Sequence, residues 1–357
     1  MPDLYAASTD SIPVDSVKYS STAWIKQLID NGGKINDPEI HYPKFPKFVV
    51  NVYNWGDRVF NSYDTTYVTG TGKNWKLMLR SRAWLESYMF MFSVHTRDLL
   101  GIRSEIYDNV GVSLSFMAIS LSATTSLKKL FTGKTSTRNH FNFNFTCSRL
   151  YGNIDVTSTH GDSKIIHFGN YMGGGLISYP FDAIKHNAIN AQIYYFFNHM
   201  KYSQAAAYCF SKYQLKSAGS AILGVSVSHQ SIEMDFSSLP ADMKAFLPSL
   251  QNDYDFRYTD YCIAGGYGYN WAIRPRTWLI NGTLLQSLGY RHDYQTTGKS
   301  GYDAVAANLM FRCALVYNHR ALYASLAGEI DANFYYNGNY MFTNAVGEMS
   351  LAVGVRF

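Results

Sequence analysis

The stretch YMFTNAVGEMSLAVGVRF (residues 340–357) contains the pattern that decides the fold. Its second half alternates between two sets of side chains, which are Met349, Leu351, Val353, Val355 and Phe357 in one set and Glu348, Ser350, Ala352, Gly354 and Arg356 in the other. Because successive side chains of a β-strand point to opposite faces, the first set forms an apolar face and the second a small or charged face. The segment therefore predicts an amphipathic strand that ends on an aromatic residue of its apolar face.

The same alternation recurs along most of the chain. Leu77, Leu79, Ser81, Ala83 and Leu85 alternate with polar residues, and so do Phe141, Phe143, Phe145 and Cys147. An antiparallel sandwich would also alternate, but it does not need many successive strands of about ten or more residues, the length that a tilted membrane strand requires. Segments of this kind are expected near 74–93, 109–126, 139–158, 186–199, 214–235, 257–273, 276–294, 303–319, 321–336 and 340–357.

The composition favours a membrane environment without transmembrane helices. Charged residues make up 16% of the chain, and 29 tyrosines and 22 phenylalanines bring the aromatic share to 16%. No run of about 18 apolar residues occurs, which excludes a transmembrane helix. Only helices and closed barrels satisfy the backbone inside lipid. Residues 74–357 are therefore predicted to form a transmembrane, antiparallel, up-and-down β-barrel in an all-β fold of about ten strands, within a range of eight to twelve.

The connections predict an orientation in a bacterial outer membrane. With an even strand number both chain ends are periplasmic, and the long connections 159–185 and 236–256 are extracellular, as in bacterial barrels. Two expected periplasmic connections, 127–138 and 200–213, are longer than this rule prefers. The terminal strand resembles the C-terminal signal of outer-membrane proteins, in which a final aromatic such as Phe357 is read by the barrel-assembly machinery. Outer-membrane lipid, including lipopolysaccharide, is the other expected partner.

Residues 1–73 differ from the rest and are expected to form a periplasmic segment or a plug. The stretch Ser21–Gly33 predicts a short helix, with a Ser/Thr start, an apolar set at helical spacing and a glycine stop. Pro38, Pro43 and Pro46 are expected to keep the following chain extended. The first five residues lack the features of a signal peptide, so the sequence is expected to be that of a mature chain.

Several phrases of the sequence resemble an uncharacterised family of Bacteroidota outer-membrane proteins, domain of unknown function 4421. They are WIKQLI (24–29), YNWGD (53–57), NSYDTTYV (61–68), GTGKNW (70–75), NVGV (109–112) and KSAGS (216–220). The resemblance covers most of the chain and implies a barrel in the outer membrane. It implies no activity, and no catalytic residue follows from it.

Charged residues on the lumen side of the first predicted strand and of the last three are the main candidate site. Because the last strand of a closed barrel pairs with the first, these charges are expected to share one wall of the lumen. They form either an ion-selective constriction or a core of ion pairs that fills a narrow barrel. The candidates are Lys76, Arg80, Arg82, Glu86, Arg312, Glu329, Asp331, Glu348 and Arg356.

Other chemistry has weaker support in the sequence. His160, Asp162, His167 and the pair His292-Asp293 fall near the extracellular rim, where a hydrolase triad could assemble. Gly70-Thr-Gly-Lys73 lacks the spacing of a phosphate-binding loop. No histidine or cysteine cluster has the spacing of metal ligands. The net charge of +5 is spread along the chain and forms no basic stripe that would bind nucleic acid. No cofactor or metal is expected. Aromatic clusters at 194–197, 335–336 and 340 are interpreted as interfacial girdles or as a carbohydrate platform.

Three functional hypotheses remain open. The first is a non-enzymatic structural or accessory subunit of a larger outer-membrane assembly, with other outer-membrane proteins or lipoproteins as partners. The second is a narrow passive pore for small solutes. The third is a surface hydrolase that acts on lipid or peptide.

Overall fold

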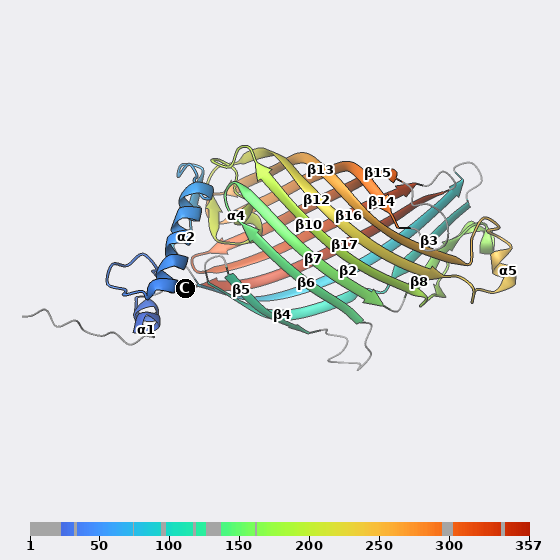
Figure 1. Ribbon diagram of the computed structural model, residues 1–357, viewed down its shortest axis with the longest axis horizontal. Helices are drawn as coiled ribbons and strands as arrows, with labels where there is room; N and C mark the ends of the chain where they lie inside the picture. Colours follow the sequence, from blue (N-terminus) through green and yellow to red (C-terminus); the bar gives the residue numbers. More distant parts are fainter. Residues whose placement is uncertain are drawn as a thin grey trace, which may run out of the picture. The chain divides into compact units, whose positions relative to one another are not determined.

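A computed structural model describes residues 23–31, 34–73, 75–93, 98–116, 119–125, 137–160, 163–294, 303–336 and 340–357 (Figure 1). The chain forms two compact units, Met1–Gly56 and Asp57–Phe357. No helix within the described ranges is both long enough and apolar enough to cross a membrane.

Two helices occupy the N-terminal part of the chain. α1 (Ala23–Asp30) confirms the short helix expected there. α2 (Lys44–Phe60), whose last four residues belong to the second unit, was not predicted, and the expectation of an extended chain through Pro43 and Pro46 is wrong. Pro43 precedes the helix and Pro46 lies in its first turn, where the backbone N–H groups have no partner within the helix and a proline therefore removes no hydrogen bond.

One antiparallel sheet of fifteen strands forms the second unit. Its strands are β2 (Trp75–Ser93), β3 (Asp98–Ser104), β4 (Tyr107–Phe116), β5 (Ile119–Thr125), β6 (Thr137–Thr146), β7 (Leu150–His160), β8 (Ser163–Phe168), β9 (Tyr179–Pro180), β10 (Ile184–Phe196), β12 (Ala218–Asp235), β13 (Asp253–Arg274), β14 (Trp278–Asp293), β15 (Asp303–His319), β16 (Leu322–Tyr336) and β17 (Met341–Arg356). β1 (Val68–Gly70) and β11 (Lys212–Gln214) form a separate pair.

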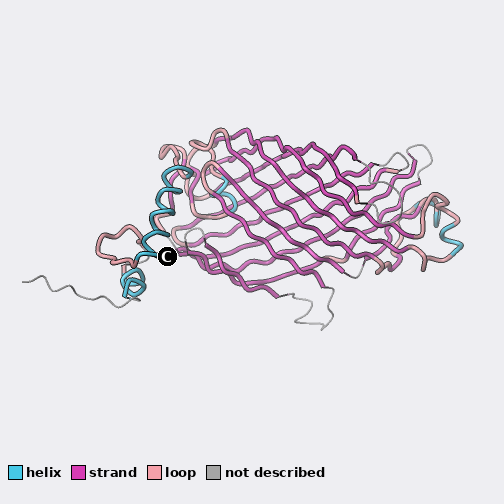
Figure 2. The backbone as a smooth tube through the Cα atoms, in the orientation of Figure 1, coloured by secondary structure: helices cyan, strands magenta, loops and turns pink. Residues whose placement is uncertain are grey.

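The sheet curls into the shape of a barrel, and its last strand pairs with its first, as expected (Figure 2). Among the described residues the sheet keeps two edges, because no register pair joins β6 to β5, β8 or β9. β17 and β2 are in register from Met341 opposite Met91 to Arg356 opposite Lys76. Next to the Lys76–Arg356 pair, the backbones of Trp75 and Phe357 exchange two hydrogen bonds, of 3.1 and 3.0 Å. The wall continues past β2 through β3, which pairs with β8.

The strand count exceeds the ten that the sequence predicts, and the error lies in the first half of the barrel. The segment expected at 139–158 is a hairpin of β6 and β7, because Cys147–Arg149 forms a turn without the glycine or proline that usually marks one. The segment expected at 109–126 similarly contains both β4 and β5, which pair with each other. β3 and β8 were not predicted. From β10 onward the expected segments match the observed strands closely.

Side chains alternate between the lumen and the outer surface as predicted. On β17, Met349, Leu351 and Val353 are more than half exposed, whereas Ala352 and Arg356 are buried. A barrel with lipid around it and polar groups inside requires this arrangement.

The two ends of the barrel are closed by different elements. The C-terminus, α4 (Gln204–Tyr208) and the hairpin turns 275–277 and 320–321 lie at one end, which we call the plug end. At the opposite end, which we call the cap end, lie the 310-helix η1 (Tyr171–Gly174) and α5 (Ala241–Lys244) (Figure 1). The long connections 159–185 and 236–256 therefore share one end, as expected.

Candidate functional site

The lumen is divided into layers that can be read along β2, whose even-numbered residues point inward. From the plug end they are Lys76, Met78, Arg80, Arg82, Trp84, Glu86, Tyr88, Phe90 and Phe92. The first two contact the plug, the middle three line a polar cavity of about 290 Å³, and the last three belong to an aromatic cap. Glu86 lies at the boundary between the cavity and the cap.

The plug is residues 198–217, the connection between β10 and β12, which folds into the lumen. α4 begins at Ser203, whose hydroxyl accepts a hydrogen bond of 3.2 Å from the backbone of Ala206. Its alanines are small enough to pass close to the barrel wall, and Ala206, Ala207 and Phe210 are buried against Met78 and other wall residues. The sequence predicts a long connection here but not its position in the lumen.

Lys76 and Arg356 hold the C-terminal end of α4. The Nζ of Lys76 donates to the carbonyl of Cys209 at 2.8 Å, and the Nε of Arg356 donates to the carbonyl of Phe210 at 2.7 Å. These two cations lie directly opposite each other in the β2–β17 register. Like charges in that position destabilise a sheet, so the two carbonyl acceptors stabilise both the wall and the plug. We call this pair the latch.

Polar side chains fix the rest of the plug. Gln214 is buried. Its side-chain carbonyl accepts hydrogen bonds from the backbone of Ser203 at 3.1 Å and from the side chain of Asn270 at 2.9 Å. Its side-chain amide donates to the backbone carbonyls of Lys201 and Lys216. The hydroxyl of Tyr208 donates to Asn281 at 2.8 Å. Burial raises the pKa of Tyr208 well above its ordinary value, so this hydroxyl stays protonated.

Residues 61–73 run along the plug and pair with it. β1 and β11 form three register pairs, and the backbone of Asp64 donates to Met200 at 2.8 Å. The rings of Tyr63 and Tyr67 lie under the ammonium groups of Lys212 and Lys216, at 4.2 and 5.2 Å. Two stretches that carry the family resemblance, 61–68 and 216–220, thus meet at the plug.

Three of the predicted lumen residues and Trp84 form one row across the wall of the cavity. In register order the row is Arg312, Glu329, Glu348 and Trp84, on β15, β16, β17 and β2. Arg312 pairs with Glu329 at 2.7 Å, and Glu348 accepts from Trp84 and pairs with Arg82 at 3.6 Å. Most of the opposite charges in the cluster therefore form ion pairs with each other within the wall.

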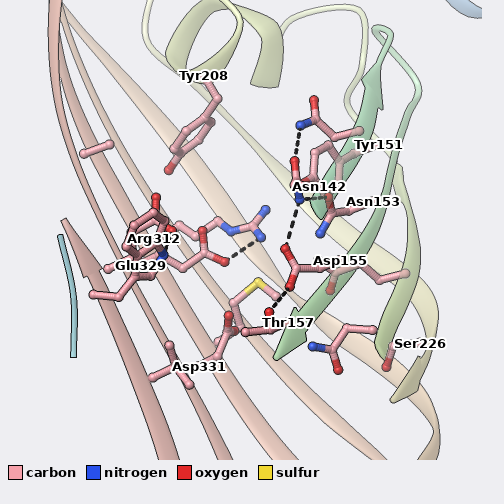
Figure 3. Close-up of a pocket in the computed structure, with 18 of the residues that line it drawn as sticks. Asn142, Tyr151, Asn153, Asp155, Thr157, Tyr208, Ser226, Arg312, Glu329 and Asp331 are labelled. Atoms are coloured by element: carbon pink, nitrogen blue, oxygen red, sulfur yellow. Dashed lines mark hydrogen bonds and ion pairs between the residues drawn. The ribbon is translucent and has the colours of Figure 1, made fainter. Parts of the chain in front are cut away.

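The opposite wall of the cavity, formed by β6 and β7, was not predicted as part of the site (Figure 3). Asp155 accepts from Thr157 at 2.9 Å and from Asn142 at 3.2 Å, and its second oxygen contacts the ring of His140. Asn142 also donates to Asn153 at 2.7 Å. The alternation of phenylalanines with polar residues in 141–146 was the available signal, since it placed Asn142, Asn144 and Thr146 on one face.

The remaining predicted residues have separate surroundings. Asp331 lines the cavity next to the Arg312–Glu329 pair (Figure 3). Arg80 also lines the cavity, and its buried Nε has no hydrogen-bond partner among the residues that the structure describes. Glu86 is fully buried and accepts from Tyr88 at 2.7 Å and from Thr159 at 3.1 Å. The cluster is therefore spread over several layers and is not one constriction ring.

An aromatic cap fills the lumen beyond Glu86. Phe90, Phe236 and Phe342 have no exposed surface. Phe342 stacks on Phe256 with ring centroids 4.4 Å apart, and Phe90 lies 4.7 Å from Phe342. Met243 of α5 and Leu247 are buried in the same cluster. The cap end is therefore closed by close-packed apolar side chains.

The rim histidines of the hydrolase hypothesis are dispersed. His167 on β8 contacts the Leu99 carbonyl at 3.1 Å, His292 on β14 packs against Tyr294, and His160 ends β7. Between β8 and β14 the sheet order inserts β3, β2, β17, β16 and β15. Asp162 lies outside the described residues. Within the described part of the chain, no group of three or more His, Cys, Asp or Glu residues could hold a metal ion.

Comparison with known families matches residues 62–357 to a single model, "Domain of unknown function (DUF4421)". The chain belongs to the DUF4421 family. In this DUF4421 chain, the matched region begins just before the strand that pairs with the plug and includes the whole barrel. No curated protein matches the chain.

Solved structures similar to this DUF4421 chain are outer-membrane barrels. The outer-membrane protease OmpT from Escherichia coli is 8% identical with a TM-score of 0.34, covering 81% of this chain and 98% of its own. The translocator domain of the autotransporter NalP from Neisseria meningitidis is 8% identical with a TM-score of 0.29, covering 80% and 89%. A bacterial polysaccharide outer-membrane secretin is 7% identical with a TM-score of 0.32, covering 80% and 99%. These scores are low, and the description of the fold rests on the strand pairing of the chain itself.

Proposed function

We propose that this chain is a bacterial outer-membrane barrel with a closed lumen that acts as a structural or accessory subunit of a larger outer-membrane assembly. The observation that carries the proposal is the closure of the lumen at both ends, by the plug held in the latch and by the aromatic cap. A barrel without a path through it acts through its outer surface, its loops or its N-terminal segment.

The outer surface supports the membrane location. On β14 the outward side chains run from Trp278 through Ile280, Leu284 and Leu288 to Tyr290, with Gln286 as a polar exception. Trp278 and Tyr290 are 12 residues apart, which corresponds to about 40 Å along the strand and to about 28–33 Å of height at the usual tilt. That height matches an apolar band with an aromatic girdle at each edge.

Other aromatic residues fall into the same two belts. Near the plug end the exposed rings include Tyr195, Phe197, Trp271 and Phe357, and near the cap end they include Tyr261, Tyr294 and Tyr336. This favours the girdle interpretation for Tyr195, Phe197 and Tyr336. It is wrong for the other members of the predicted clusters, because Tyr194, Phe196 and Tyr335 are buried and Tyr340 packs against the aromatic cap.

Bilayer conductance and co-purification test the proposal together. The purified chain in planar bilayers should give no reproducible single-channel steps, and a tagged chain extracted in mild detergent should bring other outer-membrane proteins or lipoproteins with it. Stable conductance steps from the unmodified chain, together with isolation of the chain alone, would contradict it.

A gated pore for small solutes is the second candidate, and one observation favours it. The cavity between the plug and the cap is lined by amides, hydroxyls and charged groups, so water or a small polar solute could occupy it. In that case a signal must open both ends, and the unmodified chain should conduct when the signal is present.

A further inference from the structure

Several large apolar side chains on one face of α2 are exposed to solvent. Phe45, Phe48 and Trp55 are 75, 62 and 61% exposed, and Val49 and Val52 are each 48% exposed. Scattered exposed apolar residues are ordinary on a protein surface, but five large ones on a single helix form a contiguous patch that needs an occupant.

The order of residues in α2 gathers its large apolar residues on one side. At about 100° per residue, the residues Phe45, Phe48, Val49, Val52, Trp55, Val59 and Phe60 fall within an arc of about 140°. The rest of the helix surface carries Lys44, Lys47, Asn51, Asn54 and Arg58, together with Val50.

A hydrogen bond on the polar side of α2 joins the helix to the segment that precedes it. The amide of Asn54 donates to the side-chain carbonyl of Asn36 at 2.7 Å, which places the segment before the helix against its polar face. Phe45, Phe48, Val49 and Val52 stay between 48 and 75% exposed in this arrangement.

The chain immediately after α2 is fixed to the plug end of the barrel wall. The carbonyl of Phe60 accepts from the backbone of Arg149 at 3.2 Å, and the side chain of Asn61 accepts from the backbone of Ser148 at 2.9 Å. Ser148 and Arg149 lie in the turn between β6 and β7, which follows the outward-facing Phe145. The end of α2 is therefore tethered where the apolar belt of the barrel stops.

We propose that α2 lies in the surface of the membrane leaflet at the plug end, with its apolar face among the lipid chains near the headgroups. Tryptophan and phenylalanine on the apolar face and lysine or arginine beside it are typical of helices that bind in this interface. Lys44, Lys47 and Arg58, against the single acid Asp57, fit phospholipid phosphates. The inference rests on the proposed membrane location of the barrel and adds a second, peripheral contact with lipid.

Depth-dependent fluorescence quenching on the full chain tests this inference. Single cysteines are introduced by Val52→Cys on the apolar face, Lys47→Cys on the polar face and Leu351→Cys on the outer face of β17. The background carries serine at Cys147, Cys209, Cys262 and Cys313. Each cysteine receives an environment-sensitive dye, and the protein is inserted into vesicles of phosphatidylethanolamine and phosphatidylglycerol that contain nitroxide-labelled lipid.

The proposal expects strong quenching and a shift to shorter wavelength at Val52→Cys, with the shallow nitroxide more effective than the deep one, and little quenching at Lys47→Cys. Equal exposure to water at both helix positions, with Leu351→Cys quenched, would overturn the inference and leave the barrel intact. A dye at Val52→Cys that is shielded from water but not quenched by lipid would show a protein occupant, such as a second copy, and would also overturn it. An unquenched Leu351→Cys would contradict the membrane location itself.

A native-cysteine experiment covers the case in which the serine background does not fold. Brominated phosphatidylglycerol should quench less of the total tryptophan emission in Trp55→Phe than in the unmodified chain, because the quenched interfacial tryptophan has been removed. An unchanged quenched fraction would count against a lipid contact at Trp55.

Discussion

Arg291 and Asp260 show how single residues can decide the stability of a membrane barrel. Both side chains are 1% exposed, and the guanidinium donates two hydrogen bonds of 2.6 Å to the carboxylate. The same guanidinium lies 3.9 Å from the centre of the Tyr258 ring. A charged pair in this position is stable only while both partners are present.

We expect Asp260→Ala to lower the free energy of unfolding by about 3–5 kcal/mol, because it leaves a buried, unpaired guanidinium. Glu233→Ala is the matched control, since Glu233 pairs with Arg257 at a site where both side chains are more than 40% exposed. The control should change stability by no more than about 1 kcal/mol. Both changes in stability can be measured by urea titration of the chain refolded in lipid vesicles, with the heat-dependent shift in gel mobility as the readout. Equal losses of stability in the two variants would refute the stabilising role of the Arg291–Asp260 pair.

The latch gives a second prediction at the residue scale. Lys76→Met keeps the length of the side chain but removes the donor to the Cys209 carbonyl, a charge-assisted hydrogen bond worth about 1.5–3 kcal/mol. The plug should then leave the lumen at least about ten times more often. The readout is the labelling rate of a cavity cysteine, Ser226→Cys, by a maleimide applied from the plug end. Lys185→Met, which removes an exposed lysine near the cap end, should leave the rate unchanged.

For single residues, the sequence predicts which face of a strand a side chain lies on, but not which group that side chain contacts. The alternation on β2 and β17 put Lys76, Arg80, Glu348 and Arg356 on one side of these strands, where Arg80 and Glu348 line the cavity and Lys76 and Arg356 contact the plug. It could not show that Lys76 and Arg356 bind carbonyl oxygens of a distant segment, because that contact depends on a connection more than a hundred residues away in the sequence. The use of the charges as a functional site stays a prediction.

At the scale of secondary-structure elements, two glycines of β13 allow a test of how the plug packs against the barrel wall. A Cβ atom on Gly268 would lie 2.6 Å from the hydroxyl of the buried Tyr202, whereas one on Gly265 of the same strand would meet nothing within 4 Å. Gly268→Val should therefore displace Tyr202 and raise the labelling rate of Ser226→Cys. Gly265→Val should not, and an equal rise in both variants would show that the effect is a general loosening of β13.

The elements also show where sequence patterns stop being informative. β15 was predicted at its observed bounds, because its alternation is regular and its ends carry turn residues. The β6–β7 hairpin was read as one strand, since its turn contains only Cys147, Ser148 and Arg149. α2 was missed because three prolines outweighed the helical spacing of its apolar residues, although a proline in the first turn is compatible with a helix.

At the scale of the whole molecule, the plug and the cap are independent barriers in series. Opening one of them should not create a pore. We expect Gly268→Val alone and Phe90→Ala alone to remain silent in planar bilayers, and the double variant to conduct. Phe90→Ala removes a ring from the centre of the aromatic cap, where Phe90 has no exposed surface. Conductance in either single variant would show that one end does not seal the lumen.

The central claim concerns the barrel as a whole, namely that alternate residues of each strand face lipid and a closed, polar lumen. The most direct test places a nitroxide spin label at successive positions from Gly347 to Val355 of β17 in the chain reconstituted into vesicles, and measures collisions with oxygen and with a water-soluble nickel complex. The account predicts a period of two, with oxygen access high at Met349, Leu351 and Val353, and low access to both reagents at Ser350 and Ala352. Uniform access to the nickel complex along β17, or no alternation between neighbouring positions, would contradict it.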